Sequence, residues 1–320
     1  MSRKLVTVIS VLEEHHRTAI RSAAEQKGFD ALFFDRDEDA FPALADAEII
    51  FSQSADLIGH APALKWFCTP SAGVDFLMGT EAFLSGRAVL SNSSGAYGVT
   101  IAEHIVMVIL ETLRRQQEYN EIVSRREWSR GLPVRSIKGS RVVLLGTGDI
   151  GQEAAVRLRP FGPASLTGVN RGGRNPGELF DRIFRQNELD AVLPECDILI
   201  CSLPATRESA GMLDSRRLSL LPDKALTVNV GRGSLIDQAA LEKELRAGRL
   251  YAALDVFDRE PLPADSSLWA CPNLLLTPHV AGNMTLPYTR DRIVSLFLGD
   301  FDNYCAGRPL LRRVNMDLGY

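Results

Sequence analysis

Residues 141–158, "RVVLLGTGDIGQEAAVRL", decide the fold class of this chain. An apolar, β-branched run leads into glycines at 146, 148 and 151 and then into a helical pattern. A GxGxxG pattern alone is weak, but the order strand, glycine turn, helix is the context that dinucleotide binding requires. Gly146 would allow the tight turn, Gly148 the approach of backbone to a pyrophosphate, and Gly151 close packing of helix on strand. We therefore predict a phosphate-binding loop that ends at a helix N-terminus.

Similar apolar runs surround this loop on both sides. After 141–146 they recur at 165–169, 197–204, 225–231, 250–256 and 274–278. Before it they occur at 5–10, 31–34, 48–51, 64–68 and 88–92, with helix-compatible stretches between several of them. This alternation predicts βαβ units and parallel sheets. We expect an α/β protein with two doubly wound, Rossmann-like domains.

A long helix is predicted from about Val99, where apolar residues recur every three or four positions on one face. Beyond Arg114 the sequence becomes strongly polar, although Ile122, Val123 and Trp128 persist among the charges. The polar part is either a solvated face or an arm that packs against another subunit. A final helix is expected at about 284–306.

Composition narrows the function classes. The chain has 320 residues, of which 45% are hydrophobic and 24% charged, and two domains of this size can each bury a core. A net charge of -4 argues against general affinity for nucleic acid or anionic membranes. The N-terminal apolar run is too short for a secretory signal, and no stretch is long enough to cross a bilayer. The five cysteines show no metal-ligand spacing. We expect a cytoplasmic protein with reduced thiols and no metal site.

The segment 168–175, "GVNRGGRN", lies where this fold separates NAD from NADP. An acidic residue about 20 positions beyond the glycines usually binds the ribose 2′-hydroxyl. Asn170 stands there instead, followed by Arg171 and Arg174. An asparagine can donate to a 2′-phosphate, and guanidinium groups match its oxygens. The segment favours NADP(H), with NAD(H) also accepted, and a solvated turn is the alternative.

Three later motifs, "NVGRGSLID", "LDVFDREPLP" and "LLLTPHVAG", each place a polar residue just past a strand. These residues are Arg232, Glu260 and His279. Taken singly, each has a structural explanation: a strand cap, a surface turn and a core histidine. Together they form a set that can bind a carboxylate and transfer a proton.

Seven ordered motifs carry a resemblance to the D-isomer-specific 2-hydroxyacid dehydrogenase family over nearly the whole chain. They are "SAGVD" (71–75), "AEH" (102–104), "GTGDIG" (146–151), "DILICSLPAT" (197–206), "NVGRGSLID" (229–237), "LDVFDREPLP" (254–263) and "TPHVAG" (277–282). The resemblance, with the arginines after Asn170, points to the NADP-preferring glyoxylate/hydroxypyruvate reductase-like branch.

The resemblance implies a domain plan. A flavodoxin-like substrate domain comprises 1–98 and 284–320, and the dinucleotide-binding domain, 99–283, is inserted into it. The region 99–127 would form the interdomain and dimer helices, so a homodimer is expected.

The resemblance also implies residue roles. Arg232 would hold the substrate carboxylate, His279 would be the general acid, and Glu260 would fix the histidine tautomer. Backbone N–H groups of Ala72, Gly73 and Val74 would bind the other carboxylate oxygen. Further cofactor contacts are implied at Thr147, Asp149, Ile150, Leu203, Pro204, Val230, Gly231 and Asp255.

The expected reaction is reduction of a small 2-oxo acid, such as glyoxylate or hydroxypyruvate, to the D-2-hydroxy acid. Two alternatives share the same motifs: a dinucleotide-sensing corepressor-like protein, and a dehydrogenase of another small anion of the formate or phosphite type. Side chains that would shape the substrate pocket, or equally pack in the core, are Gln53, Ser54, Tyr97, Trp269 and Met284.

Overall fold

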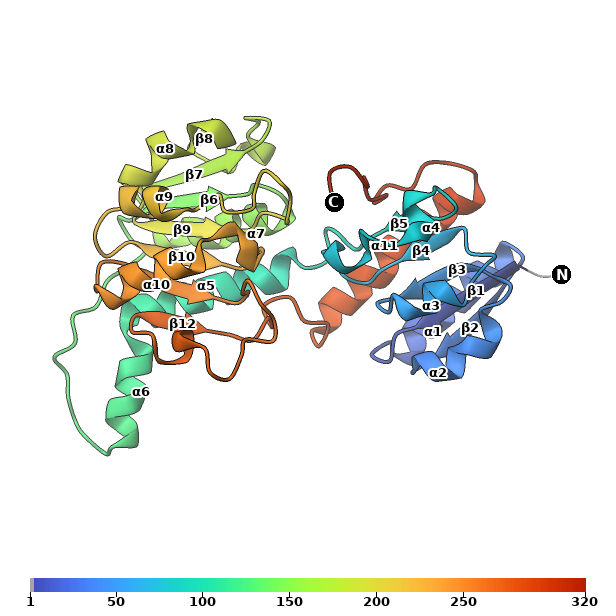
Figure 1. Ribbon diagram of the computed structural model, residues 1–320, viewed down its shortest axis with the longest axis horizontal. Helices are drawn as coiled ribbons and strands as arrows, with labels where there is room; N and C mark the ends of the chain where they lie inside the picture. Colours follow the sequence, from blue (N-terminus) through green and yellow to red (C-terminus); the bar gives the residue numbers. More distant parts are fainter. Residues whose placement is uncertain (1–2) are drawn as a thin grey trace. The chain divides into compact units, whose positions relative to one another are not determined.

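The computed structural model describes residues 3–320, and the chain divides into two units (Figure 1). Unit 1 comprises the residues up to Tyr97 together with Met284–Tyr320, and unit 2 comprises Gly98–Asn283. Because the last segment of the chain returns to unit 1, unit 2 is an insertion within it.

Unit 1 contains a five-stranded parallel sheet with the strand order β2-β1-β3-β4-β5. The strands are β1 (Arg3–Val8), β2 (Phe29–Phe34), β3 (Ala47–Ser52), β4 (Trp66–Cys68) and β5 (Val89–Ser91). The helices are α1 (Glu14–Gln26), α2 (Asp37–Ala40), α3 (Asp56–Gly59), α4 (Glu81–Leu84) and α11 (Pro287–Cys305), with the short 3₁₀ turns η1 (Phe41–Ala43) and η2 (Asp75–Leu77).

Aromatic side chains from the sheet and from α11 form the centre of the unit 1 core. Phe51 of β3 and Phe297 of α11 stack with their ring centroids 4.2 Å apart. Trp66 of β4 lies 5.3 Å from the same ring of Phe297. All three are fully buried, and each such side chain contributes about 1.5–3 kcal/mol through burial. These contacts attach the C-terminal helix to the N-terminal sheet.

Unit 2 contains a seven-stranded parallel sheet with the order β12-β11-β10-β9-β6-β7-β8. The strands are β6 (Arg141–Leu145), β7 (Ser165–Asn170), β8 (Arg182–Arg185), β9 (Ile198–Cys201), β10 (Leu226–Asn229), β11 (Tyr251–Leu254) and β12 (Leu274–Leu276). The chain enters this sheet at β6, continues outward through β7 and β8, and then crosses to β9 on the other side of β6. Ligands of open α/β sheets bind at this kind of reversal, beyond the carboxyl ends of the strands.

The helices of unit 2 cover a sheet whose central strands are buried on both faces, as parallel sheets usually are. They are α5 (Gly98–Arg114), α6 (Gln116–Ser124), α7 (Asp149–Leu158), α8 (Leu189–Val192), α9 (Ser215–Leu220) and α10 (Gln238–Arg246). The 3₁₀ turns are η3 (Arg159–Phe161), η4 (Pro176–Glu178), η5 (Gln186–Glu188), η6 (Leu193–Glu195), η7 (Gly233–Leu235) and η8 (Ser267–Ala270). The apolar face of α5, with Ile105 and Ile109 fully buried, packs against α7.

The structure differs from the sequence-based expectation in two elements of unit 2. The long helix does not continue past Arg114, because Arg115 adopts a left-handed conformation with a φ of 58° and separates α5 from α6. The edge strand β8 was not predicted, because its sequence "RIFR" has only two apolar residues between arginines. Small shifts at strand and helix ends are otherwise of the size usual for element boundaries.

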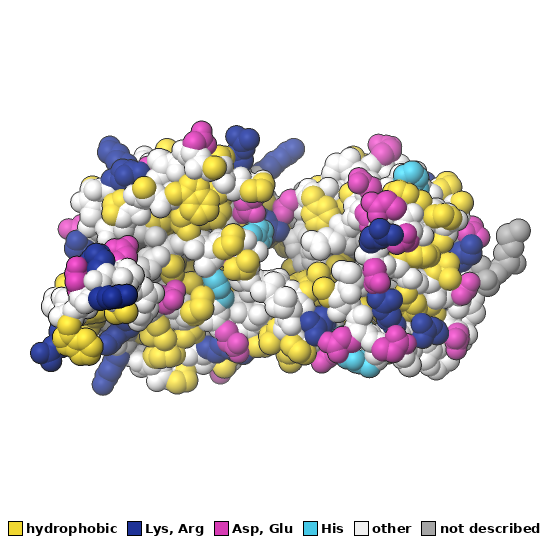
Figure 2. All heavy atoms as spheres, turned by 90° about the horizontal axis from the view of Figure 1, so that it is seen from below, with side chains coloured by type: hydrophobic (Ala, Val, Ile, Leu, Met, Phe, Trp, Pro, Cys, Tyr) yellow, Lys and Arg dark blue, Asp and Glu magenta, His cyan; other side chains and the backbone are white. Residues whose placement is uncertain are grey.

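Positive and negative side chains are interspersed with apolar ones on the face shown in Figure 2. The five cysteines are free, and all except Cys305 are buried. Within residues 3–320, every helix is too short or too polar to cross a bilayer.

Candidate active site

The glycine loop after β6 has the geometry of a phosphate cradle. Gly146 has a φ of 108°. Residues with a Cβ atom rarely adopt this conformation, whereas glycine does so readily. A Cβ on Gly151 would lie 2.2 Å from the carbonyl oxygen of Gly146, so α7 packs directly on the turn. A Cβ on Gly148, in contrast, would meet nothing within 4 Å. The backbone at Gly148, just before α7, therefore borders open space, which leaves room for a bound pyrophosphate at the helix N-terminus.

The other residues of this loop have structural contacts of their own. The carboxylate of Asp149 packs against Gly98, where a Cβ would lie only 2.6 Å from one carboxylate oxygen. A carboxylate at this place stabilises the N-terminus of α5. The methyl group of Thr147 packs against Gly168 of β7, and its hydroxyl accepts a hydrogen bond from Asn170.

Asn170 organises the turn after β7. Its amide nitrogen donates to Thr147 Oγ1 at 2.7 Å and to the carbonyl oxygen of Arg174 at 2.8 Å. Its amide oxygen accepts the N–H of Gly173 at 2.6 Å. The amide hydrogens are thus engaged, with the glycine loop on one side and within the turn on the other, so Asn170 fixes the loop rather than offering a donor to a phosphate. The guanidinium of Arg171 forms an ion pair with Glu208 at 2.8 Å.

A third arginine, which the sequence reasoning missed, lies at the same turn. Arg185 ends β8 and is the register partner of Asn170. A Cβ on Gly173 would lie 3.2–3.3 Å from the Arg185 side chain, so this side chain runs alongside the turn. The sequence reasoning missed Arg185 because it did not predict strand β8, and it is the pairing of β8 with β7 that places Arg185 beside this turn.

Glu260 and His279 form a hydrogen-bonded pair. His279 Nδ1 lies 2.6 Å from Glu260 Oε2, and Glu260 Oε1 accepts the backbone N–H of Phe257 at 2.8 Å. Because a carboxylate only accepts, Nδ1 must carry a proton. Nε2 is therefore the ring nitrogen that can exchange a proton with a substrate. The ring is about half exposed, 51% by side-chain area.

Asp255 holds the backbone that presents His279. Its buried carboxylate accepts from Thr277 Oγ1 at 2.6 Å and from the N–H groups of Val280 and Ala281 at 2.9 and 3.0 Å. The Asp255 carbonyl accepts the N–H of His279 at 2.9 Å. His279 itself has a φ of 53°, an uncommon conformation that these bonds maintain. These contacts give Asp255 a positioning function in addition to the cofactor contact implied by the resemblance.

His104, from the "AEH" motif, lies behind the same segment. Its Nε2 is 3.3 Å from Thr277 Oγ1. That hydroxyl donates to Asp255, so it accepts from the imidazole N–H. Burial lowers the pKa of His104, so the ring is neutral near pH 7. The sequence showed the "AEH" motif but gave His104 no role, because its partner Thr277 is 173 positions away in the chain.

Arg232 lies in the loop after β10, and Glu260 and His279 follow β11 and β12 of the same sheet. Asn229 fixes this turn by donating to the carbonyl oxygen of Arg232 at 2.9 Å and accepting from the N–H of Gly231 at 3.1 Å. A Cβ on Gly233 would overlap the backbone of Phe257, at 1.9 Å. The Arg232 loop therefore packs against the loop that leads to Glu260. The Arg232 guanidinium is partly exposed and donates to the carbonyl oxygen of Gly231 at 2.8 Å.

The remaining cofactor residues implied by the resemblance lie at the carboxyl ends of β9 and β10. Leu203 and Val230 are buried there. A Cβ on Gly231 would lie 2.6 Å from the carbonyl oxygen of Leu203, so the two loops are in contact. Pro204 accepts a hydrogen bond from Ser209 at 2.7 Å.

The predicted substrate loop belongs to unit 1. Ala72, Gly73 and Val74 follow β4, and Asn92 donates to the carbonyl oxygen of Ala72 at 2.8 Å. Tyr97, considered for the pocket, is buried and donates to Pro70 at 2.8 Å, and burial raises its pKa. Tyr97 thus anchors this loop.

Four further pocket candidates lie at or near the surface. Gln53 is exposed, Ser54 and Met284 are partly exposed, and Trp269 is 55% exposed.

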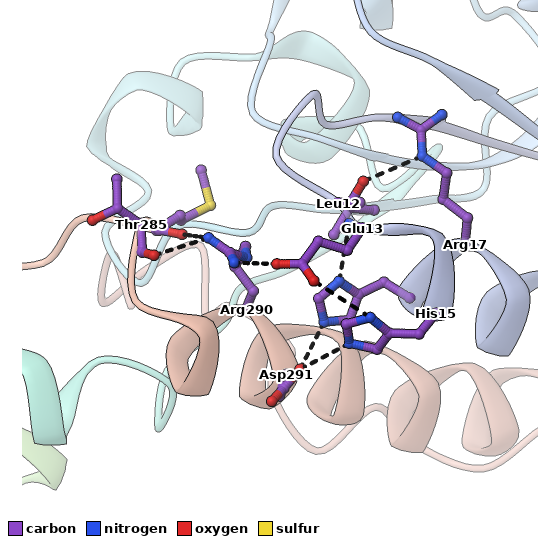
Figure 3. A network of polar contacts seen from close by, with 9 residues as sticks. Leu12, Glu13, His15, Arg17, Thr285, Arg290 and Asp291 are labelled. Atoms are coloured by element: carbon purple, nitrogen blue, oxygen red, sulfur yellow. Dashed lines mark hydrogen bonds and ion pairs between the residues drawn. The ribbon is translucent and has the colours of Figure 1, made fainter.

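A polar cluster in unit 1, separate from the residues described above, connects the start of α1 with the first turn of α11 (Figure 3). Nε2 of His15 and of His16 lies 3.2 and 2.8 Å from Asp291 Oδ1, a spacing that also suits metal ligands. However, His16 Nδ1 accepts the N–H of Glu13 at 3.1 Å, so the proton of the neutral ring is on Nε2. A metal ion needs that nitrogen unprotonated. The contacts instead fit a hydrogen-bonded junction, which lowers the pKa of Asp291.

The geometry in unit 2 defines a dinucleotide-binding sheet with a histidine–glutamate pair, and the comparisons identify its family. The family model for the D-isomer specific 2-hydroxyacid dehydrogenase, NAD binding domain, matches residues 106–281. Glyoxylate/hydroxypyruvate reductase B of Pectobacterium atrosepticum is 32% identical over 249 residues, covering 75% of this chain and 77% of that protein. The chain belongs to the D-isomer specific 2-hydroxyacid dehydrogenase family and is an oxidoreductase.

Solved structures agree with this assignment. A D-isomer specific 2-hydroxyacid dehydrogenase family protein of Aeromonas salmonicida has a TM-score of 0.88 and 31% identity, over 99% of this chain and 100% of that chain. An NADPH-dependent glyoxylate/hydroxypyruvate reductase of Sinorhizobium meliloti, in complex with NADP and sulfate, has a TM-score of 0.82 and 26% identity, over 99% and 100%. The predicted fold class is confirmed, and the family supports a nicotinamide dinucleotide as cofactor.

Proposed function

We propose that this protein is an NADP(H)-preferring reductase that converts a small 2-oxo acid, such as glyoxylate or hydroxypyruvate, into the D-2-hydroxy acid. The observation that carries the proposal is the 2.6 Å contact between His279 Nδ1 and Glu260, which leaves Nε2 to act on substrate. The names of the relatives from P. atrosepticum and S. meliloti support the substrate class.

The residues of the site fit a nicotinamide dinucleotide. The open space at Gly148 and the close packing at Gly151 provide a cradle for its pyrophosphate. When bound, the reduced nicotinamide supplies a hydride to the substrate carbonyl carbon. The chain must then supply a proton to the carbonyl oxygen and hold the substrate carboxylate.

His279 supplies the proton in this proposal. Nε2–H of the protonated ring donates to the carbonyl oxygen, and Glu260 stabilises the positive ring through Nδ1. The hydrogen bonds of Asp255 to residues 277–281 keep the imidazole in this orientation. Arg232 binds the substrate carboxylate with its planar guanidinium and polarises the carbonyl.

The preference for NADP(H) rests on the arginines after β7. Position 170 carries no acid, so a 2′-phosphate meets no carboxylate at that position. Because the Asn170 amide is engaged within the turn, attraction for the phosphate comes from Arg171 and Arg174. The assignments of the Ala72–Val74 backbone to the carboxylate and of a homodimer remain predictions. Val123 and Trp128, 68% and 91% exposed, are the side chains that such a dimer would cover.

Removing both arginines tests the cofactor preference. In the Arg171→Gln/Arg174→Gln variant we expect the Kd of NADPH to rise about 10- to 100-fold, as loss of charge-assisted bonds to phosphate predicts. The Kd of NADH should change less than about twofold, within the range of ordinary surface substitutions. Arg182→Gln, an exposed arginine on β8, is the matched control. Equal weakening of both cofactors would show that the pair does not recognise the phosphate.

A substrate panel tests the reaction itself. We expect NADPH oxidation with glyoxylate and hydroxypyruvate at rates well above those with formate or phosphite and NADP⁺. Turnover only with formate or phosphite would move the assignment to dehydrogenation of a small anion. Intact NADPH binding without turnover of any of these compounds would favour a dinucleotide-sensing protein.

A further inference from the structure

An ion pair joins two loops on opposite sides of the glycine loop. Arg171 follows β7, Glu208 lies in the loop after β9, and their side chains approach to 2.8 Å. Strand β6, which leads into the glycine loop, lies between β7 and β9 in the sheet. The pair therefore bridges the sheet at the reversal of strand order, where open α/β sheets bind ligands.

The backbone turns that carry Arg171 and Glu208 are each fixed by local hydrogen bonds. On one side, Asn170 fixes the turn that carries Arg171 through three hydrogen bonds. On the other side, Ser209 Oγ accepts the N–H of Thr206 at 2.8 Å and donates to the carbonyl oxygen of Pro204 at 2.7 Å. Glu208 lies within this hydrogen-bonded turn, so its carboxylate is directed at Arg171 from an anchored backbone.

We infer that Glu208 is a specificity-determining residue that supplies, from the loop after β9, the carboxylate missing at position 170. A 2′-phosphate would compete with this carboxylate for the Arg171 guanidinium and would be repelled by it. A ribose 2′-hydroxyl, in contrast, can donate a hydrogen bond to it. Glu208 thus moderates the preference for NADP(H) and lets the site accept NAD(H). The inference rests on the proposed function, because it requires that the 170–174 turn recognises the 2′ position.

The test removes the charge of Glu208 while keeping its shape. In Glu208→Gln, we expect the ratio of the NADH Kd to the NADPH Kd to rise about three- to fivefold, a size that suits an exposed ion pair. The dinucleotide fragments report on the same site without catalysis. By calorimetry, 2′,5′-ADP should bind more tightly by a similar factor, and 5′-AMP should not. Glu195→Gln, an exposed carboxylate 3.7 Å from Arg182 in the same unit, is the control.

The outcomes separate the inference from the proposed function. An unchanged or lower Kd ratio in Glu208→Gln, with 2′,5′-ADP weakened by Arg171→Gln/Arg174→Gln, overturns the role of Glu208 and leaves the arginines in place. Unaltered binding of 2′,5′-ADP by the double arginine variant overturns both. A higher ratio together with tighter 2′,5′-ADP binding supports the inference.

Discussion

His279→Asn should reduce kcat for 2-oxo acid reduction by about 100- to 10,000-fold, the usual contribution of general acid–base catalysis. Asparagine is the better substitution, because residue 279 has a φ of 53° and asparagine tolerates this left-handed region. The variant keeps a backbone N–H to donate to the Asp255 carbonyl. Stopped-flow or steady-state NADPH oxidation measures the loss, and fluorescence titration measures the Kd of NADPH, which should stay within about twofold.

Glu260→Gln is the companion variant. A glutamine can still accept from His279 Nδ1, but it does not stabilise the charged ring. We expect kcat to fall by less than in His279→Asn. Near wild-type turnover in His279→Asn would remove this residue from the proton transfer, whatever the result for Glu260→Gln.

Arg232→Lys should lower kcat/KM for 2-oxo acids about 10- to 100-fold, because an ammonium cannot make the planar two-point contact with a carboxylate. The loss should appear both in KM, since the carboxylate is bound in ground and transition states, and in kcat, since the guanidinium polarises the carbonyl in the transition state. The Kd of NADPH should not change. Steady-state kinetics with glyoxylate at saturating NADPH measures the effect.

Arg246→Lys controls for arginine replacement in general. This side chain lies on α10, is 45% exposed and pairs with Glu242, outside the site. It should leave kcat/KM unchanged. Equal kinetic parameters for Arg232→Lys and the wild type would exclude Arg232 from carboxylate binding.

The sequence was sufficient for the fold class because most strands of the parallel sheets are short apolar runs, which need cover on both faces. It was insufficient for β8, whose "RIFR" sequence looks polar until it pairs with β7. It was also insufficient for the end of α5. Arg115 adopts its left-handed conformation without the glycine or proline that would mark a break, and its Nε lies 2.5 Å from Glu118 Oε1.

For the site, local motifs and the family resemblance identified the residue types and the Glu260–His279 pairing, but not most of the other contacts. The glycine loop follows from a motif whose geometry is fixed over a few residues, and the pairing of Glu260 with His279, 19 positions apart, was expected from the family resemblance. The bonds from the Asp255 carboxylate to residues 277–281 span more than 20 positions, and the Arg171–Glu208 pair spans 37. Such contacts depend on which strands are neighbours. For the same reason, the engagement of the Asn170 amide with Thr147 was not visible in the sequence.

The most direct measurement of the central claim is the product of hydroxypyruvate reduction. The purified protein is incubated with hydroxypyruvate and either NADPH or NADH, and the glycerate formed is resolved by chiral chromatography. We predict D-glycerate, formed with a higher kcat/KM for NADPH than for NADH. L-glycerate, or no glycerate with either cofactor while NADPH still binds, would contradict the account.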